Sequence, residues 1–250
     1  MKALVTGASS GIGRDIAREL AKKGYDLILV ARDIDKLNSV KESIKNVNVE
    51  IIQMDISNVE NCKKLHQMVD TDIDILINNA GFGVFGKFDE TDLDKEINLI
   101  NTNIVGLHIL AKLFLQDMKK RNKGYILNVA SISGFMPGPL MATYYASKSY
   151  VVKLSESIRE ELIKDNSNVK IGILCPGPVA TNFDNVANVK FRSKYLSSEY
   201  VAKYTVEKIL KNKFYIVPGF SIKCLRHIVK IVPDSIISKF SYEVQKRKYK

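Results

Sequence analysis

Short apolar runs, rich in β-branched residues, alternate with longer amphipathic segments over about the first 175 residues. Several of these runs are apolar at nearly every position, which is typical of strands in a parallel sheet that is covered on both faces. The predicted strands span residues 3–6, 27–31, 49–54, 73–78, 125–129 and 169–174, and a seventh is expected at 214–217. The alternation predicts an α/β fold, a doubly wound parallel sheet of about seven strands with helices on both faces.

Residues 1–220 are predicted to form this single domain, and two features fall outside its regular alternation. An irregular segment at about 182–198 follows a strand end, where ligands of open α/β sheets bind, so we expect a substrate loop there. The C-terminal extension, residues 221–250, has apolar positions that fit two amphipathic helices interrupted at Pro233. We expect this extension to pack on or beside the domain.

The charge is concentrated near the C-terminus. Residues 1–185 hold 23 Lys and Arg against 23 Asp and Glu, whereas residues 186–250 hold 15 against 4, which accounts for the whole net charge of +11. The simplest interpretation is a solvated lysine-rich face. The extension could also cover the substrate cleft, pair with another subunit or lie on an anionic membrane surface, and we favour these roles in that order. No nucleic-acid partner is expected.

Other features narrow the class of protein. The longest apolar runs have the length of strands, and Met1 and Lys2 lead directly into the first predicted strand, so neither a membrane span nor a secretory leader is expected. Three cysteines without a CxxC pair fit a reducing compartment, and three scattered histidines predict no metal site. We therefore expect a cytoplasmic protein.

The glycine-rich stretch TGASSGIG, residues 6–13, lies between the first predicted strand and the first predicted helix. Gly7 allows a tight turn, Gly11 lets the backbone approach a pyrophosphate, and Gly13 permits close packing of helix on strand. The helix N-terminus then presents N–H donors to an anion. A glycine loop alone is weak evidence, but this position predicts a Rossmann-type dinucleotide site.

The residues after the second predicted strand bear on the choice of dinucleotide. A carboxylate at this point binds the ribose diol of NAD, whereas an arginine accommodates the 2′-phosphate of NADP. Arg32 therefore favours NADP(H), while Asp33 leaves NAD(H) open because it could take a ribose hydroxyl. Asp55, after the third predicted strand, is expected either to accept from the adenine amino group or to cap the next helix.

The stretch YYASK, residues 144–148, places two tyrosines near one lysine. Apolar residues at helical spacing predict a helix over about 143–164, in which Tyr144 and Tyr145 are both within reach of Lys148. An ammonium about 4 Å from a phenol contributes about 4 kcal/mol at an effective dielectric of about 20. This predicts a lowered tyrosine pKa, although burial opposes the shift. Spacing alone does not decide which tyrosine is the acid–base.

Four stretches, TGASSGIG (6–13), NNAG (78–81), YxxxK (144–148) and PG (176–177), resemble in order and spacing the signature set of the short-chain dehydrogenase/reductase family. The resemblance covers about residues 1–220. It implies hydride transfer between a nicotinamide cofactor and a carbonyl or alcohol. It also selects Tyr144 as the acid–base, because Ser131 lies thirteen residues upstream, as the family's serine does, whereas Ser133 has the wrong spacing. Tyr145 is then expected to turn toward a neighbouring helix, with a subunit interface as one location.

The resemblance implies further roles, residue by residue. Ser131 polarises the carbonyl, Lys148 lowers the pKa of Tyr144 and holds the nicotinamide ribose, and Asn103, rather than Asn101, holds a water in a proton relay. The implied cofactor contacts are Gly7, Ser9, Ser10, Gly11, Ile12, Gly13, Arg32, Asp55, Ile56, Asn79, Ala80, Gly81, Tyr144, Lys148, Pro176, Gly177, Val179 and Thr181. A homodimer or homotetramer is expected.

Aromatic and methionine side chains in three stretches around this centre predict an apolar cleft, and hence an apolar carbonyl substrate. These side chains are Phe82, Phe85, Phe135, Met136, Met141, Phe183 and Phe191. The sequence thus predicts an NADPH-dependent oxidoreductase that reduces a ketone to an alcohol. The alternatives are an NAD-dependent alcohol dehydrogenase of the same fold and an NADP(H) sensor without turnover. The complete set of Ser131, Tyr144, Lys148 and Asn103 argues against the sensor.

Overall fold

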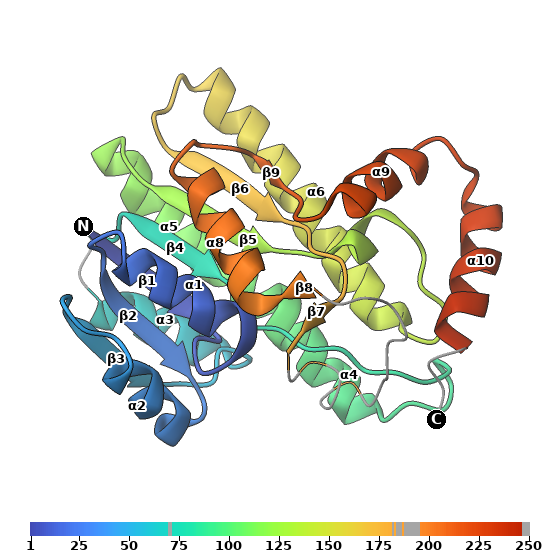
Figure 1. Ribbon diagram of the computed structural model, residues 1–250, viewed down its shortest axis with the longest axis horizontal. Helices are drawn as coiled ribbons and strands as arrows, with labels where there is room; N and C mark the ends of the chain where they lie inside the picture. The colour runs from blue at the N-terminus through green and yellow to red at the C-terminus, as the bar shows by residue number, and fades with distance from the viewer. Residues whose placement is uncertain (70–71, 182, 184–186, 188–195, 247–250) are drawn as a thin grey trace.

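The computed structural model describes residues 1–69, 72–181, 183, 187 and 196–246. Seven parallel strands form one twisted sheet in the order β3-β2-β1-β4-β5-β6-β9 (Figure 1). The strands are β1 (Lys2–Thr6), β2 (Asp26–Ala31), β3 (Val49–Gln53), β4 (Ile75–Asn78), β5 (Tyr125–Val129), β6 (Lys170–Leu174) and β9 (Tyr215–Ile216). The predicted fold class and all seven predicted strands are confirmed.

Helices cover both faces of the sheet. On one face α1 (Gly11–Ala21), α2 (Ile34–Glu42) and α8 (Ser198–Ile209) contribute to one buried apolar cluster. On the other face α3 (Val59–Met68), α5 (Leu107–Arg121) and α6 (Ala142–Lys164) contribute to a second. Successive residues of β2 alternate between them, with Leu27 and Leu29 in the first cluster and Ile28 and Val30 in the second. This two-sided burial explains why the strands are apolar at nearly every position.

Within the described part of the chain, one continuous helix is long and apolar enough to cross a membrane, judged by length and composition alone. It spans Leu93–Arg121 and consists of α4 (Leu93–Ile100), a π-helical turn η1 (Asn101–Gly106) and α5. The length of unbroken apolar runs does not reveal this helix, because polar residues lie between its apolar ones. In this fold Leu110, Phe114 and Met118 are fully buried in the cluster on the sheet, so the helix packs as a core element.

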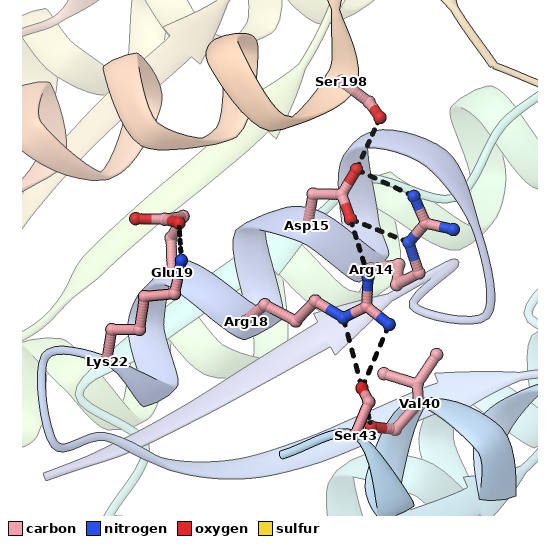
Figure 2. Close-up of polar contacts among 8 residues, drawn as sticks. All are labelled: Arg14, Asp15, Arg18, Glu19, Lys22, Val40, Ser43 and Ser198. Carbon is pink, nitrogen blue, oxygen red and sulfur yellow. Dashed lines mark hydrogen bonds and ion pairs between the residues drawn. The ribbon is translucent and has the colours of Figure 1, made fainter. Parts of the chain in front are cut away.

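Polar contacts fix α1 against its neighbours (Figure 2). The buried Asp15 carboxylate accepts hydrogen bonds from Arg14, at 2.7 Å, and from Ser198 at the start of α8. Burial alone would raise the pKa of Asp15, but these hydrogen bonds outweigh it and hold the pKa below its usual value. On the other side Arg18 donates to Ser43, which directly follows α2. The glycine-rich loop before α1 is therefore carried by a helix that is anchored on two sides.

The C-terminal extension forms α9 (Phe220–Ile228) and α10 (Asp234–Lys246), so the two predicted helices and the break at Pro233 are confirmed. In Figure 1 α10 stands apart from the sheet, at the edge of the molecule, and its C-terminal end approaches the N-terminal end of α6. Two short strands, β7 (Val179–Ala180) and β8 (Leu196–Ser197), pair with each other. Most of the substrate loop predicted at 182–198 lies outside the described residues.

Candidate active site

Glycines shape the loop between β1 and α1. Gly7 and Gly11 have φ angles of +64° and +53°, in the left-handed region that glycine adopts without strain. At Gly13 a Cβ would lie 2.3 Å from Nδ2 of Asn79 and 2.5 Å from the Gly7 carbonyl oxygen. The Asn79 amide, at the end of β4, donates to the Thr6 and Gly7 carbonyl oxygens at 3.0 and 3.2 Å. Side chains larger than hydrogen would therefore break the brace between loop and sheet.

The N-terminal end of α1 is open to an anion. Ser10 is the N-cap residue, but its side chain makes no capping hydrogen bond, and the first turn of α1 holds no acidic residue. Across the cleft a Cβ at Gly11 would lie 3.1 Å from the side chain of Thr181, so the two walls approach closely here. Uncapped N–H groups beside a glycine cradle fit the phosphates of a dinucleotide.

A cleft of about 490 Å³ runs along the carboxyl ends of the strands. The predicted cofactor and catalytic residues that line it are Gly7, Ser9, Ser10, Gly11, Ile12, Arg32, Asp55, Ile56, Asn79, Ala80, Gly81, Ser131, Tyr144, Lys148, Pro176, Gly177, Val179 and Thr181. Two predicted residues, Gly13 and Asn103, lie behind the cleft wall and support it.

Sequence reasoning missed a further group of lining residues. Most are direct neighbours of the strand ends, where the rule that ligands bind beyond those ends could have found them. They are Val30, Ala31, Lys36, Met54, Thr102, Val129, Ala130, Ile132, Pro178 and Gln245. Gln245 belongs to α10 and is 100 residues from the tyrosine that it contacts, so no local pattern pointed to it.

Two carboxylates, Asp33 and Asp55, and two cations, Arg32 and Lys36, line the β2 end of the cleft. Asp33 caps α2 by accepting from the Lys36 backbone N–H at 3.0 Å, and it pairs with the Lys36 ammonium. The hydrogen bond from that ammonium holds the pKa of Asp33 below its usual value. Arg32 is 64% exposed and lies 3.8 Å from Asp55. The Arg32 guanidinium thus remains accessible from the cleft.

Asp55 does not cap the following helix. Its Oδ1 accepts from the Ser57 backbone N–H at 2.9 Å, whereas Asn58 is the N-cap residue of α3 and accepts from the Asn61 N–H. The prediction of Asp55 as a helix cap is therefore wrong, because the chain makes one more turn before α3 begins. Its carboxylate remains on the cleft wall.

Ser131, Tyr144 and Lys148 meet at the other end of the cleft. Ser131 follows β5 and hydrogen-bonds to the hydroxyl of Tyr144, on the first turn of α6. Lys148, one turn further along α6, places its Nζ 5.8 Å from the centroid of the Tyr144 ring and donates to the Val129 carbonyl oxygen at 2.8 Å. An ammonium has three donors. Among the described residues only this carbonyl accepts a hydrogen bond from Lys148.

Burial dominates the titration of this pair. Burial raises the pKa of Tyr144, and the hydrogen bond between Tyr144 and Ser131 offsets only part of that effect. It also lowers the pKa of Lys148 to about 8. The net pKa of Tyr144 is thus above its ordinary value because of burial, and the predicted lowering of this pKa by Lys148 stays a prediction.

Asn103 lies on the π-helical turn and is fully buried. Its Nδ2 donates to the Phe82 carbonyl oxygen at 2.9 Å and to Ser147 at 3.1 Å, and its Oδ1 accepts from the Phe82 N–H. A Cβ at Gly81 would lie 2.8 Å from that Oδ1 and 3.4 Å from the Lys148 ammonium. Asn103 therefore holds the segment after β4 against α6, next to Lys148.

Tyr145 and Ser133, the alternatives to Tyr144 and Ser131, also form hydrogen bonds. Tyr145 hydrogen-bonds to Ser133, and it turns toward α10 of the same chain, where Gln245 donates to its hydroxyl. The expectation that Tyr145 turns toward a neighbouring helix is thus confirmed. Ser131 donates to Ser133 at 3.1 Å, so the two serines and the two tyrosines share one network.

Apolar side chains also pack around Tyr144. Phe82, Met141 and Phe183 line the cleft, and the Phe183 and Tyr144 rings lie 5.3 Å apart. Phe85 packs against the same group. Phe135 instead packs in a separate cluster, with the Arg226 guanidinium over its ring, and neither Phe135 nor Met136 lines the cleft. Phe191 lies outside the described residues.

Comparisons with known proteins place this geometry in context. A model of the short chain dehydrogenase family matches residues 1–190. A very-long-chain 3-oxoacyl-CoA reductase of Coccidioides immitis is 38% identical over 178 residues, 68% of this chain and 51% of the relative. An 11-beta-hydroxysteroid dehydrogenase-like protein of Arabidopsis thaliana is 38% identical over 211 residues, 80% of this chain and 66% of the relative. The chain thus spans about half to two thirds of these relatives.

Solved structures agree with the fold over most of the chain. A short-chain dehydrogenase from Sphingobium yanoikuyae in complex with NADPH has a TM-score of 0.82 and 27% identity, covering 88% of each chain. A short-chain dehydrogenase/reductase from Burkholderia phymatum in complex with NAD has a TM-score of 0.83 and 26% identity, covering 90% of this chain and 91% of the other. The family match confirms the resemblance seen in the motifs. The chain belongs to the short-chain dehydrogenase/reductase family, whose members are NAD(P)-dependent oxidoreductases.

Proposed function

We propose that this protein reduces an apolar ketone to an alcohol with NADPH. The observation that carries the proposal is the Tyr144 hydroxyl, hydrogen-bonded to Ser131 at the end of a cleft whose nearby walls are Met141 and Phe183. A proton donor beside apolar walls suits an apolar carbonyl compound. The two relatives above are named for a 3-oxoacyl thioester and a hydroxysteroid, both lipid-derived, which supports the same substrate class.

The chain's own residues supply a proton donor, a polarising group and a positioning group. When bound, NADPH supplies the hydride that the carbonyl carbon gains. Tyr144 donates its phenolic proton to the carbonyl oxygen, which completes the alcohol. Ser131, hydrogen-bonded to Tyr144, stabilises the charge that develops on that oxygen. Lys148 lines the cleft, and among the described residues its ammonium donates only to the Val129 carbonyl oxygen. Its remaining N–H groups can therefore donate hydrogen bonds to ribose hydroxyls in the cleft.

The function is tested by following NADPH oxidation with purified protein and a panel of ketones of increasing apolar size. Turnover of larger apolar ketones, with weak activity on small polar ones, supports the proposal. Preferential turnover of alcohols with NAD supports the dehydrogenase alternative instead. Tight binding of NADPH with no turnover on any compound supports the sensor alternative and refutes the reductase.

The preference for NADPH is proposed on the charges at the end of β2. Arg32 is accessible from the cleft. Asp33, the carboxylate that could bind a ribose diol, already accepts a hydrogen bond from the Lys36 backbone N–H in α2 and pairs with the Lys36 ammonium. We expect Arg32→Ala to weaken NADPH binding about tenfold to a hundredfold, because a charge-assisted hydrogen bond contributes about 1.5–3 kcal/mol. NADH binding is expected to change less than about threefold, since NADH lacks the phosphate.

Calorimetric titration of both cofactors measures this difference. The matched control is Lys41→Ala, an exposed cation on α2 that does not line the cleft. If the wild-type protein binds NADH more tightly than NADPH, or Arg32→Ala weakens both equally, the preference for NADPH is wrong.

Oligomeric state, cytoplasmic location and membrane contact stay predictions. Exposed apolar side chains do occur on the C-terminal helices and their connection, among them Phe220, Ile231 and Phe240. Sedimentation of the full chain, alone and with anionic vesicles, measures whether a second copy or a lipid surface covers them.

A further inference from the structure

A chain of hydrogen bonds connects the C-terminal helix to the acid–base. Gln245 donates to the hydroxyl of Tyr145, and Tyr145 also hydrogen-bonds to Ser133. Ser133 accepts from the hydroxyl of Ser131 at 3.1 Å, and Ser131 bonds to Tyr144. Three side chains, those of Tyr145, Ser133 and Ser131, thus link Gln245 of α10 to Tyr144, although Gln245 and Tyr144 are about 100 residues apart along the chain.

The buried face of α10 is shaped for this contact. Three residues spaced four apart, Ile237, Ser241 and Gln245, are buried at 7%, 6% and 1% exposure. Two of the three are polar, and both Ser241 and Gln245 hydrogen-bond to Tyr145. The adjacent stripe, with Ile236 and Phe240, is exposed at 57% and 69%. The Tyr145 hydroxyl is therefore a main polar attachment point for α10.

Tyr145, which α10 contacts, is itself held in place by packing. A Cβ at Gly138 would lie 2.1 Å from Cγ of Tyr145, so the Tyr145 ring packs flat on a position that tolerates only glycine. The Tyr145 and Tyr144 ring centroids are 6.1 Å apart in an edge-to-face arrangement. Gln245 lines the cleft together with Met141, Tyr145 and Phe183. The end of α10 thus contributes to the same wall as the apolar residues around Tyr144.

We propose that Tyr145 and Gln245 are positioning residues that fasten α10 to α6, so that α10 closes one side of the substrate pocket and limits the size of the ketone. This inference rests on the proposed reductase function. In Figure 1 α10 stands apart from the sheet, and two of its three buried residues, Ser241 and Gln245, hydrogen-bond to Tyr145. Loss of the buried hydrogen bond leaves a polar group unpaired, which favours local opening of the helix.

The test compares Tyr145→Phe, Gln245→Ala and the double variant with the wild-type full chain. Glu243→Ala is the matched control, because Glu243 lies on the exposed face of the same helix. Amide hydrogen exchange over residues 234–246 is measured first, since it requires no activity. Then kcat and KM are measured for a small and a bulky ketone, together with the Kd of NADPH.

Each single variant is expected to speed exchange in α10 about tenfold and to shift the bulky-to-small ratio of kcat/KM about tenfold toward the bulky ketone. The double variant is expected to exchange about as fast as Tyr145→Phe alone, because Tyr145→Phe already removes the hydrogen bond between Tyr145 and Gln245. NADPH affinity and the Glu243→Ala control are expected to stay within about twofold of wild type.

Wild-type exchange rates in both single variants, or fully additive effects in the double variant, would overturn the fastening of α10. Faster exchange with an unchanged size preference would overturn its role as a pocket wall. If the wild-type protein reduces no ketone at all, the proposed function fails. In that case the exchange rates still decide whether Tyr145 and Gln245 hold α10.

Discussion

Replacing Tyr144 by phenylalanine is expected to lower kcat/KM for a ketone about a thousandfold, because a positioned proton donor contributes about 10²–10⁴ to the rate. The loss is expected in kcat, since the ring and its packing against Phe183 remain. Cofactor affinity is expected to stay within about threefold of wild type. The measurement is steady-state kinetics with NADPH and the best ketone of the panel.

Tyr145→Phe is the matched control, since it removes the same atom from the next residue of the same helix. Its effect is expected in KM and in size preference, with kcat retained within about fivefold. Abolished turnover in Tyr145→Phe with near-normal turnover in Tyr144→Phe would reverse the assignment of the acid–base.

The pKa of Tyr144 also predicts a direction for the reaction. Burial raises this pKa, so the phenol holds its proton throughout the neutral range. A protonated Tyr144 can donate during reduction, whereas alcohol oxidation requires it to accept. We therefore expect the rate of reduction to stay level from about pH 6 to pH 8 and the rate of oxidation to rise with pH.

The fold could be predicted from the sequence because the hydrophobic pattern that indicates each strand and helix is local and repeats along the chain. Apolar strands alternate with amphipathic helices, and each strand of the sheet was visible in its own few residues, as in "LILVA" of β2. The π-helical turn at Asn101–Gly106 was not visible, because its residues continue the helical pattern on both sides. Irregular turns of this kind are frequent at functional sites, and this one carries Asn103.

The candidate site was predictable where residues are neighbours along the chain. Lys148 lies one turn from Tyr144, and Gly7, Gly11 and Gly13 lie within one loop. The direction of the Tyr144 pKa shift was not predictable, because it depends on how deeply the tyrosine is buried. Gln245 was not predictable either, since its place beside Tyr145 is set by how α9 and α10 fold back.

Lys148→Met is expected to stabilise the cofactor-free protein while it lowers turnover about a thousandfold. Burial lowers the pKa of Lys148 from 10.5 to about 8, and keeping the ammonium charged below pH 8 therefore costs about 3 kcal/mol. Methionine has a similar length and carries no charge, but it loses the hydrogen bond to Val129, at about 1 kcal/mol. The net gain in the free energy of unfolding at pH 7 is expected to be about 2 kcal/mol.

The gain has a defined pH dependence. Between pH 8 and 10.5 the unfolded wild-type chain keeps the Lys148 proton that the folded chain has released, so the stability of the wild-type protein rises with pH in this window. The advantage of Lys148→Met is thus fully present below pH 8 and is lost as the pH approaches 10.5. Denaturant unfolding of both proteins without NADPH, at several pH values, measures the difference.

Lys153→Met is the control, because Lys153 is exposed on the same helix and pairs with Glu156 at the surface. Its stability is expected to stay within about 0.5 kcal/mol of wild type at every pH. A Lys148→Met variant that is less stable at pH 7, or a gain that does not change between pH 8 and 10.5, would contradict the buried ammonium. A gain with the expected pH dependence, together with about a thousandfold loss of turnover, would show that this buried charge is kept for function at the expense of stability.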